Sequence, residues 1–422
     1  MTKQLVGSRA SVWCAGAVLM AAAAAPAAAQ QRDPIEQGLA VAMKHAVLAA
    51  ASTDAAAPAP QDKPADPPAD KPADNPVLKF FANTELSGFV DTYYLYNFNK
   101  PSAPAYTLGD VKVDNALRAF DVTHNSFSLS LAEIAFEKKP AADSRAGFRV
   151  DLDYGSTANL VAAFDPGGTT VYQNIQQAYL SYLADVGSGL QVDVGKFVTP
   201  AGFEVIEAKD NWNYSRGLLF TWAIPLYHVG VRAAYTVNDK VSVTGFLFNG
   251  WNNAVDNNTG KSLGISAAIK VTPKLSLSEN YIFGPELTGT NDHLRQLSDT
   301  VLTFPLTGKL NFALNYDYGS ENGLSWQGVA LYGKYQANDM FSITPRYEFF
   351  NDKDGWALIG QNVQEFTLTG ETKFKDGVVM RLEYRGDWGD TPPLWLNGSG
   401  EPKKSQNTIS VSWIYAFSTK AP

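Results

Sequence analysis

Two polar residues, His124 and Ser126, have side-chain types and a spacing that could support nucleophilic catalysis. Residues two apart lie on the same face of a strand, where an imidazole can act as the general base for a hydroxyl. Hydrolytic sites also need an acid partner, oxyanion donors and a nucleophile elbow, and none of these accompanies the pair in the sequence. Because polar residues are ordinary at the mouth of a strand, we predict no catalytic residue and expect that the protein is not an enzyme.

Metal-binding residues show no convincing pattern. His45, His228 and His293 lack the spacing of metal ligands. The segments 351–355 and 255–260 resemble the first residues of calcium loops, but both lack the closing glutamate. Asp, Asn and Gly are also the residues that turns favour. We therefore predict neither a metal nor a cofactor.

The segment 199–227 combines charges of both signs with several aromatic rings. If the surrounding elements enclose a passage, facing carboxylates and cations would set an electric field across it and limit its width. The alternative is an external loop packed on a rim. The candidates for this electrostatic role are Glu204, Glu207, Lys209, Asp210 and Arg216.

The N-terminus has the features of a secretory signal peptide, which we place at residues 1–29. Lys3 and Arg9 precede an apolar run, and small residues end it. Cleavage there would remove the single cysteine, so an exported mature chain would need stabilisation other than disulfides. Without Lys3 and Arg9, 32 basic and 42 acidic residues remain, a formal charge of −10. The absence of a basic patch argues against nucleic acid as a partner.

Residues 30–76 predict a short periplasmic extension. Residues 34–52 have helical composition, and the Pro- and Ala-rich stretch that follows repeats Asp-Lys-Pro-Ala-Asp at 62–66 and 70–74. Such a segment cannot bury a core, so we expect an extended linker.

From residue 84 onward, apolar side chains recur at every second position, which predicts strands. In the last strand, 407–417, the apolar stripe ends in aromatic residues. In other strands the opposite face carries charges, which a dry soluble core would not tolerate unpaired. A water-filled lumen would tolerate them, and some would form salt bridges that brace the wall. These candidates for the lumen wall are Arg149, Asp151, Asp153, Arg346, Glu348, Arg381, Glu383 and Arg385.

The connections between these strands alternate between short and long. Short turns are predicted at 138–144, 185–189, 237–240, 272–274, 305–309, 336–340 and 375–377, and long connections at 99–123, 157–173, 199–227, 252–261, 284–296, 319–325, 351–363 and 388–405. Short periplasmic turns and long external loops are typical of outer-membrane barrels. We therefore predict that residues 77–422 form an all-β, transmembrane, up-and-down antiparallel β-barrel of about 16 strands, with both termini periplasmic.

Several runs in this region resemble the OmpL-like outer-membrane β-barrel porins, also described as β-barrel porin type 2. They are "GFVDTYYLYNFNKPS" from Gly88, "FDVTHNSFSLSLAEIAFEK" from Phe120, "GKFVTPAGFEVIEAKDNWNYSRGLLF" from Gly195 and "IPLYHVGVRAAY" from Ile224. The resemblance covers residues 84–417 and implies a channel in the outer membrane of a Gram-negative-type envelope.

The sequence thus favours a passive diffusion channel for small hydrophilic solutes. A substrate-selective, sugar-type channel with an aromatic track remains an alternative, and an outer-membrane hydrolase or an anchor or adhesin barrel is a more distant one. The expected partners are outer-membrane lipid, the barrel-assembly machinery through the C-terminal strand, small hydrophilic solutes and two further copies in a homotrimer.

Overall fold

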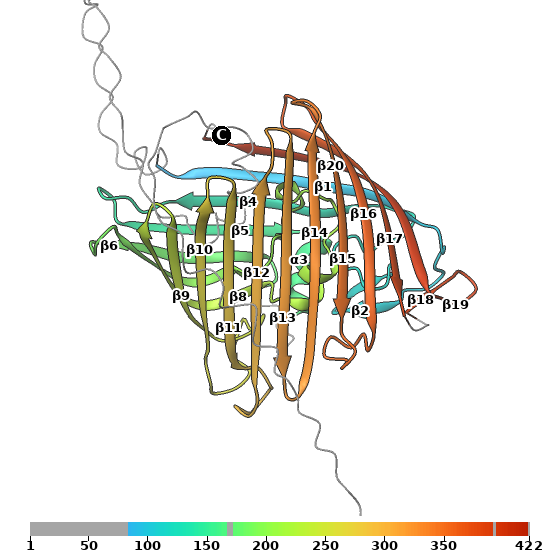
Figure 1. Ribbon diagram of the computed structural model, residues 1–422, viewed down its shortest axis with the longest axis horizontal. Coiled ribbons are helices and arrows are strands. Elements are labelled where there is room, and N and C mark those ends of the chain that lie inside the picture. The colour runs from blue at the N-terminus through green and yellow to red at the C-terminus, as the bar shows by residue number, and fades with distance from the viewer. Residues whose placement is uncertain (1–82, 167–171, 391–393, 421–422) are drawn as a thin grey trace, which may run out of the picture.

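The computed structural model describes residues 83–166, 172–390 and 394–420. The predicted signal peptide at 1–29 and the extension at 30–76 lie outside these residues. Figure 1 shows that the described chain forms one barrel.

Sixteen antiparallel strands close this barrel, in the order β1-β20-β17-β16-β15-β14-β13-β12-β11-β10-β9-β8-β7-β6-β5-β4. The prediction of an up-and-down barrel of about 16 strands is confirmed. The strands are β1 (Glu85–Asn97), β4 (Ser126–Lys138), β5 (Ala146–Tyr154), β6 (Ile175–Ala184), β7 (Leu190–Val198), β8 (Tyr227–Asn238), β9 (Val241–Phe248), β10 (Ser262–Thr272), β11 (Leu275–Pro285), β12 (Leu294–Pro305), β13 (Leu310–Glu321), β14 (Leu324–Gln336), β15 (Phe341–Asn351), β16 (Asn362–Lys373), β17 (Val378–Gly389) and β20 (Ser405–Ser418).

The last strand closes the barrel against the first. The β1–β20 register runs from Ser87 opposite Ser418 to Asn97 opposite Thr408. On β20 the side chains of Ile409, Trp413, Tyr415 and Phe417 point outward, and Trp413 is 39% exposed whereas its neighbour Ser412 is 1% exposed. The predicted orientation of this strand is therefore confirmed.

The outer wall is apolar along nearly every strand, but one carboxylate interrupts it. Glu279, the fifth residue of β11, lies opposite Thr300 of β12, and its buried neighbour Asn280 points into the barrel. Ser298 and Thr300 donate hydrogen bonds to the two oxygens of Glu279, over 2.8 and 2.6 Å. The sequence analysis did not single out this residue.

The predicted short turns all lie at one end of the barrel, but one predicted long connection is wrong. Residues 319–325 do not form a loop, because β13 and β14 extend until only Asn322 and Gly323 separate them. Both residues have positive φ, 48° and 80°, as a tight type I′ hairpin requires.

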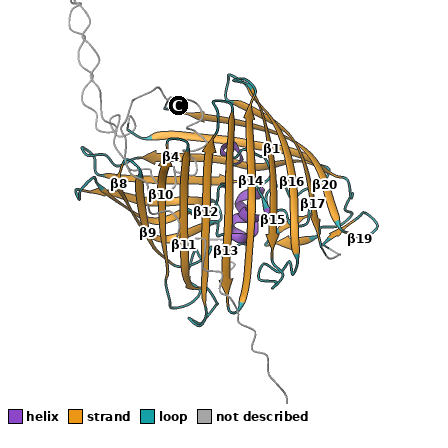
Figure 2. Cartoon of the chain, in the orientation of Figure 1, coloured by secondary structure: helices purple, strands orange, loops and turns teal. Residues whose placement is uncertain are grey.

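Six of the long connections contribute residues to a hydrophobic core inside the barrel. Figure 2 shows the helical segments (purple) behind strands β14 and β15. Leu117 and Phe120 come from the first connection, Val161 from the second, and Leu219 from the third. The small elements of the connections are β2 (Tyr106–Leu108), β3 (Val111–Val113), helix α3 (Ser156–Ala163), the 3₁₀ turn η1 (Ala208–Asp210), the π-helical turn η2 (Leu219–Ala223), β18 (Trp395–Leu396) and β19 (Pro402–Lys403). Within the described ranges, no helix is long and apolar enough to cross a membrane.

Candidate functional site

The connection between β7 and β8, residues 199–226, crosses the inside of the barrel. The backbone N–H of Phe203 donates to Oδ1 of Asn315 on β13 (2.9 Å). Further along, Trp326 of β14 donates through Nε1 to the carbonyl oxygen of Ala223 (3.0 Å). Because β7 and β13 are far apart in the strand order, these contacts place the connection across the lumen. We call residues 199–226 the lumen loop.

Arg346, on the inner face of β15, holds the lumen loop to the wall. Its Nη1 donates to Glu204 Oε1 (2.5 Å) and to the carbonyl oxygen of Ser215 (2.6 Å). Its Nε donates to Glu365 of the neighbouring strand (2.7 Å). Arg346, Glu204 and Glu365 are all buried. Their charged groups therefore interact with each other in place of water.

Two more arginines bind the loop backbone. Arg381 donates to the carbonyl oxygens of Ala208 (2.5 Å) and Asn211 (2.7 Å), while its Nε pairs with Glu371. Arg385 donates to the carbonyl oxygen of Arg216 (2.6 Å) and pairs with Asp387 on its own strand (2.8 Å). A planar guanidinium can bind a wall carboxylate and loop carbonyls together because its donors point in several directions.

Carboxylates of the wall bind the backbone N–H groups of the same loop. Glu383 accepts from the amides of Tyr214 (2.6 Å) and Ser215 (3.0 Å). Glu348 accepts from the amide of Leu218, and Asp91 of β1 accepts from the Tyr214 hydroxyl (3.1 Å). The predicted wall charges of β15 and β17 therefore fix the lumen loop, where a water-filled lumen was expected around them.

The five predicted residues of the loop divide into two groups. Glu204 and Arg216 are buried, the first paired with Arg346 and the second stacked over the Phe120 ring at 4.5 Å. Glu207 is also buried and accepts a hydrogen bond from Gln176 (2.5 Å), and burial raises the pKa of its carboxyl group. Lys209 and Asp210 pair with each other (2.5 Å), and both side chains stay partly exposed to the lumen.

The predicted wall residues of β5 form a second charged region, next to β4. Asp151 is bound by Arg149 (2.9 Å) and by Gln177 of β6 (2.6 Å). Asp153 lies opposite Glu133 of β4, and both Asp153 oxygens and Glu133 Oε2 lack a hydrogen-bond partner. The strands β20 and β1 separate this acidic region from the arginines of β15 and β17.

The sequence analysis missed the contribution of the connection between β1 and β4. Arg118 donates to Asp387 through Nη2 (2.7 Å) and also pairs with Asp121. Trp222 of the lumen loop donates to the carbonyl oxygen of Leu117 (3.1 Å). The sequence signal for this contribution is an arginine and an aspartate among apolar residues, "ALRAFDV" at 116–122, within the predicted long connection 99–123.

Aromatic rings of the interior pack against each other. Trp326 and Trp356 stack with ring centroids 3.5 Å apart, and Trp251 meets both edge-on. Trp251 and Trp326 are buried. Trp251 and Trp326 therefore belong to the interior core, and Trp356 packs against it partly buried.

The alternative sites considered from sequence have structural roles. Nδ1 of His124 accepts the backbone N–H of Asn97 (3.0 Å), and Ser126 donates to the carbonyl oxygen of Phe127 (3.2 Å). In the calcium-like segment 351–355, Asp352 accepts three backbone N–H groups of its own turn. The residues that the structure describes contain no group of three or more His, Cys, Asp or Glu side chains arranged for a metal ion.

A closed 16-strand barrel with an apolar exterior and a charged loop across its interior defines the class of outer-membrane channels. The chain belongs to the family described as "Putative beta-barrel porin-2, OmpL-like", which matches residues 83–417. It is a porin of the outer membrane. No match was found among curated protein sequences.

Solved structures with the same fold are only distantly similar in sequence. The outer-membrane channel DcaP of Acinetobacter baumannii is 14% identical, with a TM-score of 0.51 over 79% of this chain and 97% of that one. An anion-selective porin from Comamonas acidovorans is 11% identical, with a TM-score of 0.51 over 79% and 99%. Salmonella typhi OmpF, solved with daunomycin, is 11% identical, with a TM-score of 0.52 over 79% and 97%.

Proposed function

We propose that this porin is a passive diffusion channel for small hydrophilic solutes, in which the lumen loop forms the constriction. The observation that supports this role best is that side chains of the wall bind both the carbonyl oxygens and the N–H groups of the loop. Arg346, Arg381 and Arg385 bind its carbonyl oxygens, and Glu383 and Glu348 bind its N–H groups. A constriction held in this way keeps a constant width during passive permeation.

The partly exposed Lys209 and Asp210 are the residues we assign to contact with passing ions. Glu207 and Glu133 of the acidic region lie close enough to Lys209 to interact with it electrostatically. Charges within about 8–10 Å of a passing ion are only partly screened at physiological ionic strength. The constriction would therefore act on both the size and the charge of the solute.

Shortening the lumen loop tests this function. Replacing residues 205–214 by a short Gly-Ser linker should raise the single-channel conductance in planar bilayers. Deleting residues 288–292, from the connection between β11 and β12, is the matched control and should leave the conductance near the wild-type value. Equal conductance in the two variants would place the constriction elsewhere.

The other functions have less support. A sugar-type channel would need aromatic faces open to the solute, whereas Trp251 and Trp326 are buried. A hydrolase would need the imidazole of His124 near the Ser126 hydroxyl, and both groups bond to backbone atoms instead. We therefore assign no enzymatic activity to this barrel.

We also propose an assembly and a topology for this porin. Residues 1–29 direct export, residues 30–76 form a periplasmic extension, and the short turns and both termini face the periplasm. The C-terminal strand β20 is the segment that the barrel-assembly machinery would recognise, and the apolar outer wall contacts lipid. A similar barrel, Vibrio cholerae OmpT, was solved in a trimer form, and we propose a homotrimer here.

A further inference from the structure

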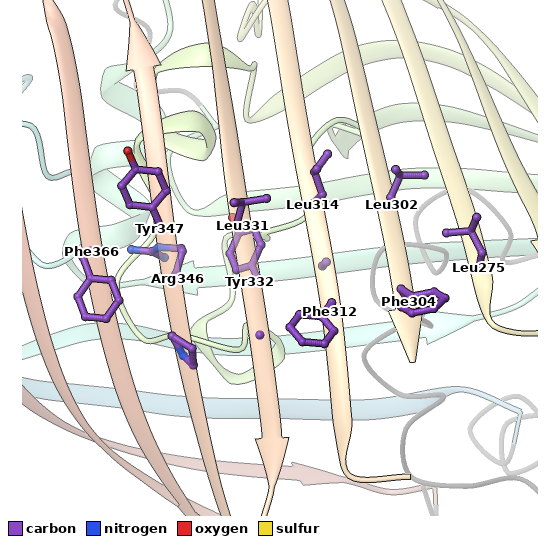
Figure 3. A pocket seen from close by; sticks show the side chains of 13 residues that line it. Leu275, Leu302, Phe304, Phe312, Leu314, Leu331, Tyr332, Arg346, Tyr347 and Phe366 are labelled. Atoms are coloured by element: carbon purple, nitrogen blue, oxygen red, sulfur yellow. The ribbon is translucent and has the colours of Figure 1, made fainter. Parts of the chain in front are cut away.

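A groove of about 520 Å³ lies in the outer wall of the barrel, across strands β11 to β16 (Figure 3). It is lined by side chains that alternate with inward-pointing residues of the same strands, so it opens toward the membrane and not toward the lumen. The large outward side chains around it are Leu302, Phe304, Phe312, Leu314, Leu331, Tyr347 and Phe366.

The groove exists because Gly333 and Pro345 lie next to each other between larger residues. Gly333 has no side chain, and a Cβ there would lie 3.4 Å from Cε1 of Phe312 and 3.8 Å from Cγ of Pro345. Pro345 has no N–H group, and the β14–β15 register is interrupted between the pairs Tyr332–Arg346 and Tyr335–Ile343. The wall is therefore hollowed where other strands carry a bulky side chain.

The chemistry of the groove fits a hydrocarbon chain. The one outward polar group on its rim, the Tyr347 hydroxyl, already donates to Gln364 (2.6 Å). Within a bilayer the gain from filling such a hollow is van der Waals packing, because an empty space leaves its lining without partner atoms. A flexible acyl chain can follow the hollow left by Gly333 and Pro345 and make contact with the side chains around it.

The depth of the groove determines which lipid it meets. Pro345 is the fifth residue of β15 and Phe312 the third of β13, both counted from the short turns. At about 3.3 Å per residue, both lie within roughly 17 Å of that barrel end. We propose that the groove binds one acyl chain of a phospholipid in the periplasmic leaflet. This assignment of the leaflet rests on the periplasmic position of the short turns proposed above.

Native mass spectrometry of the full chain, extracted from outer membranes, tests the proposal. The detergent concentration is raised until loosely bound lipid dissociates from the rest of the outer wall. The phospholipid molecules that remain bound to each chain are then counted. Wild-type protein should keep one phospholipid, and Gly333→Phe or the smaller Gly333→Leu should lose it. Gly245→Phe is the matched control, because Gly245 faces the membrane on β9 and a Cβ added there would have no other atom within 4 Å, so this variant should keep the lipid.

Several results would overturn the proposal. They are a wild-type protein without retained lipid, equal retention in both Gly333 variants, or retention of lipopolysaccharide instead of phospholipid. A change in the number of chains per assembly in the Gly333 variants alone would assign the groove to a second copy. The single-channel conductance of the wild-type protein is recorded in parallel. If this protein shows no channel activity, the result contradicts the proposed function and not the proposal for the groove.

Discussion

Arg346 of β15 and Glu204 of the lumen loop form an ion pair of 2.5 Å with both side chains buried. The two residues are 142 positions apart in the chain, and their contact joins the first part of the loop to the far wall. The pair is therefore the contact on which the position of the lumen loop most directly depends.

We expect Arg346→Gln to loosen the lumen loop and destabilise the barrel. The substitution leaves Glu204 buried without its cation and Glu365 with only the longer contact to Arg385 (3.4 Å), and breaking a buried pair in this way costs about 3–5 kcal/mol. Unfolding by urea in lipid vesicles measures the loss, and current noise in single-channel recordings reports the loop motion. Glu204→Gln in the same chain should restore part of the stability, because it removes one of the uncompensated carboxylates.

The control for this pair is Arg145→Gln. Arg145 pairs with the exposed Asp185 at a short turn (3.2 Å), and exposed pairs contribute only about 0–1 kcal/mol. A similar loss of stability in Arg145→Gln and Arg346→Gln, or no coupling between Arg346 and Glu204 in the double variant, would contradict the assigned role.

Neutralising three carboxylates of the lumen loop should shift the ion preference of the channel toward anions. The variant replaces Glu204, Glu207 and Asp210 by their amides, which removes the partly exposed carboxylate of Asp210 and two buried carboxyl groups of the same loop. The reversal potential under a salt gradient measures the shift. Replacing the exposed Asp143, Asp185 and Asp239 of the short turns by Asn removes the same charge outside the lumen, and this control should shift the potential less.

The carboxylate on the outer wall should reduce the stability of the barrel in a bilayer. Glu279→Leu replaces it with the kind of side chain that the other strands present to lipid, so the free energy of unfolding in vesicles should rise. Leu277→Glu, two residues away on the same face, should lower it, since a charge on the lipid face is unfavourable near the midplane. If Glu279→Leu instead lowers the stability, the hydrogen bonds that Ser298 and Thr300 donate to this carboxylate outweigh the cost of its position on the outer wall.

Cysteine labelling in intact cells tests the proposed topology. Single cysteines at Asn291 and Ser399, which are exposed in long connections, should react with a membrane-impermeant maleimide. Cysteines at Asp239 and Asp376, in short turns, should react only after the outer membrane is opened. The opposite pattern would invert the barrel in the membrane and would also move the Gly333 groove to the other leaflet.

The sequence alone determined which side faces the membrane in the strands where large apolar side chains alternate with polar ones. Because successive side chains of a strand point to opposite faces, the stripe ending at Trp413 and Phe417 specified both the strand and its orientation. The alternation of connection lengths specified the up-and-down order of the strands. The prediction of a long connection at 319–325 was wrong. Asn322 and Gly323 form a two-residue turn there, so β13 and β14 continue through residues with the composition of a loop.

Only the tertiary structure decided what the charges do. Arg346, Arg381 and Glu383 were predicted as inward residues, but their partners come from a loop more than 100 residues away in the chain. No local pattern encodes such a contact, since it depends on which strands closure of the barrel brings opposite the loop. The same holds for the groove, where Gly333 and Pro345 become neighbours only through the pairing of β14 with β15.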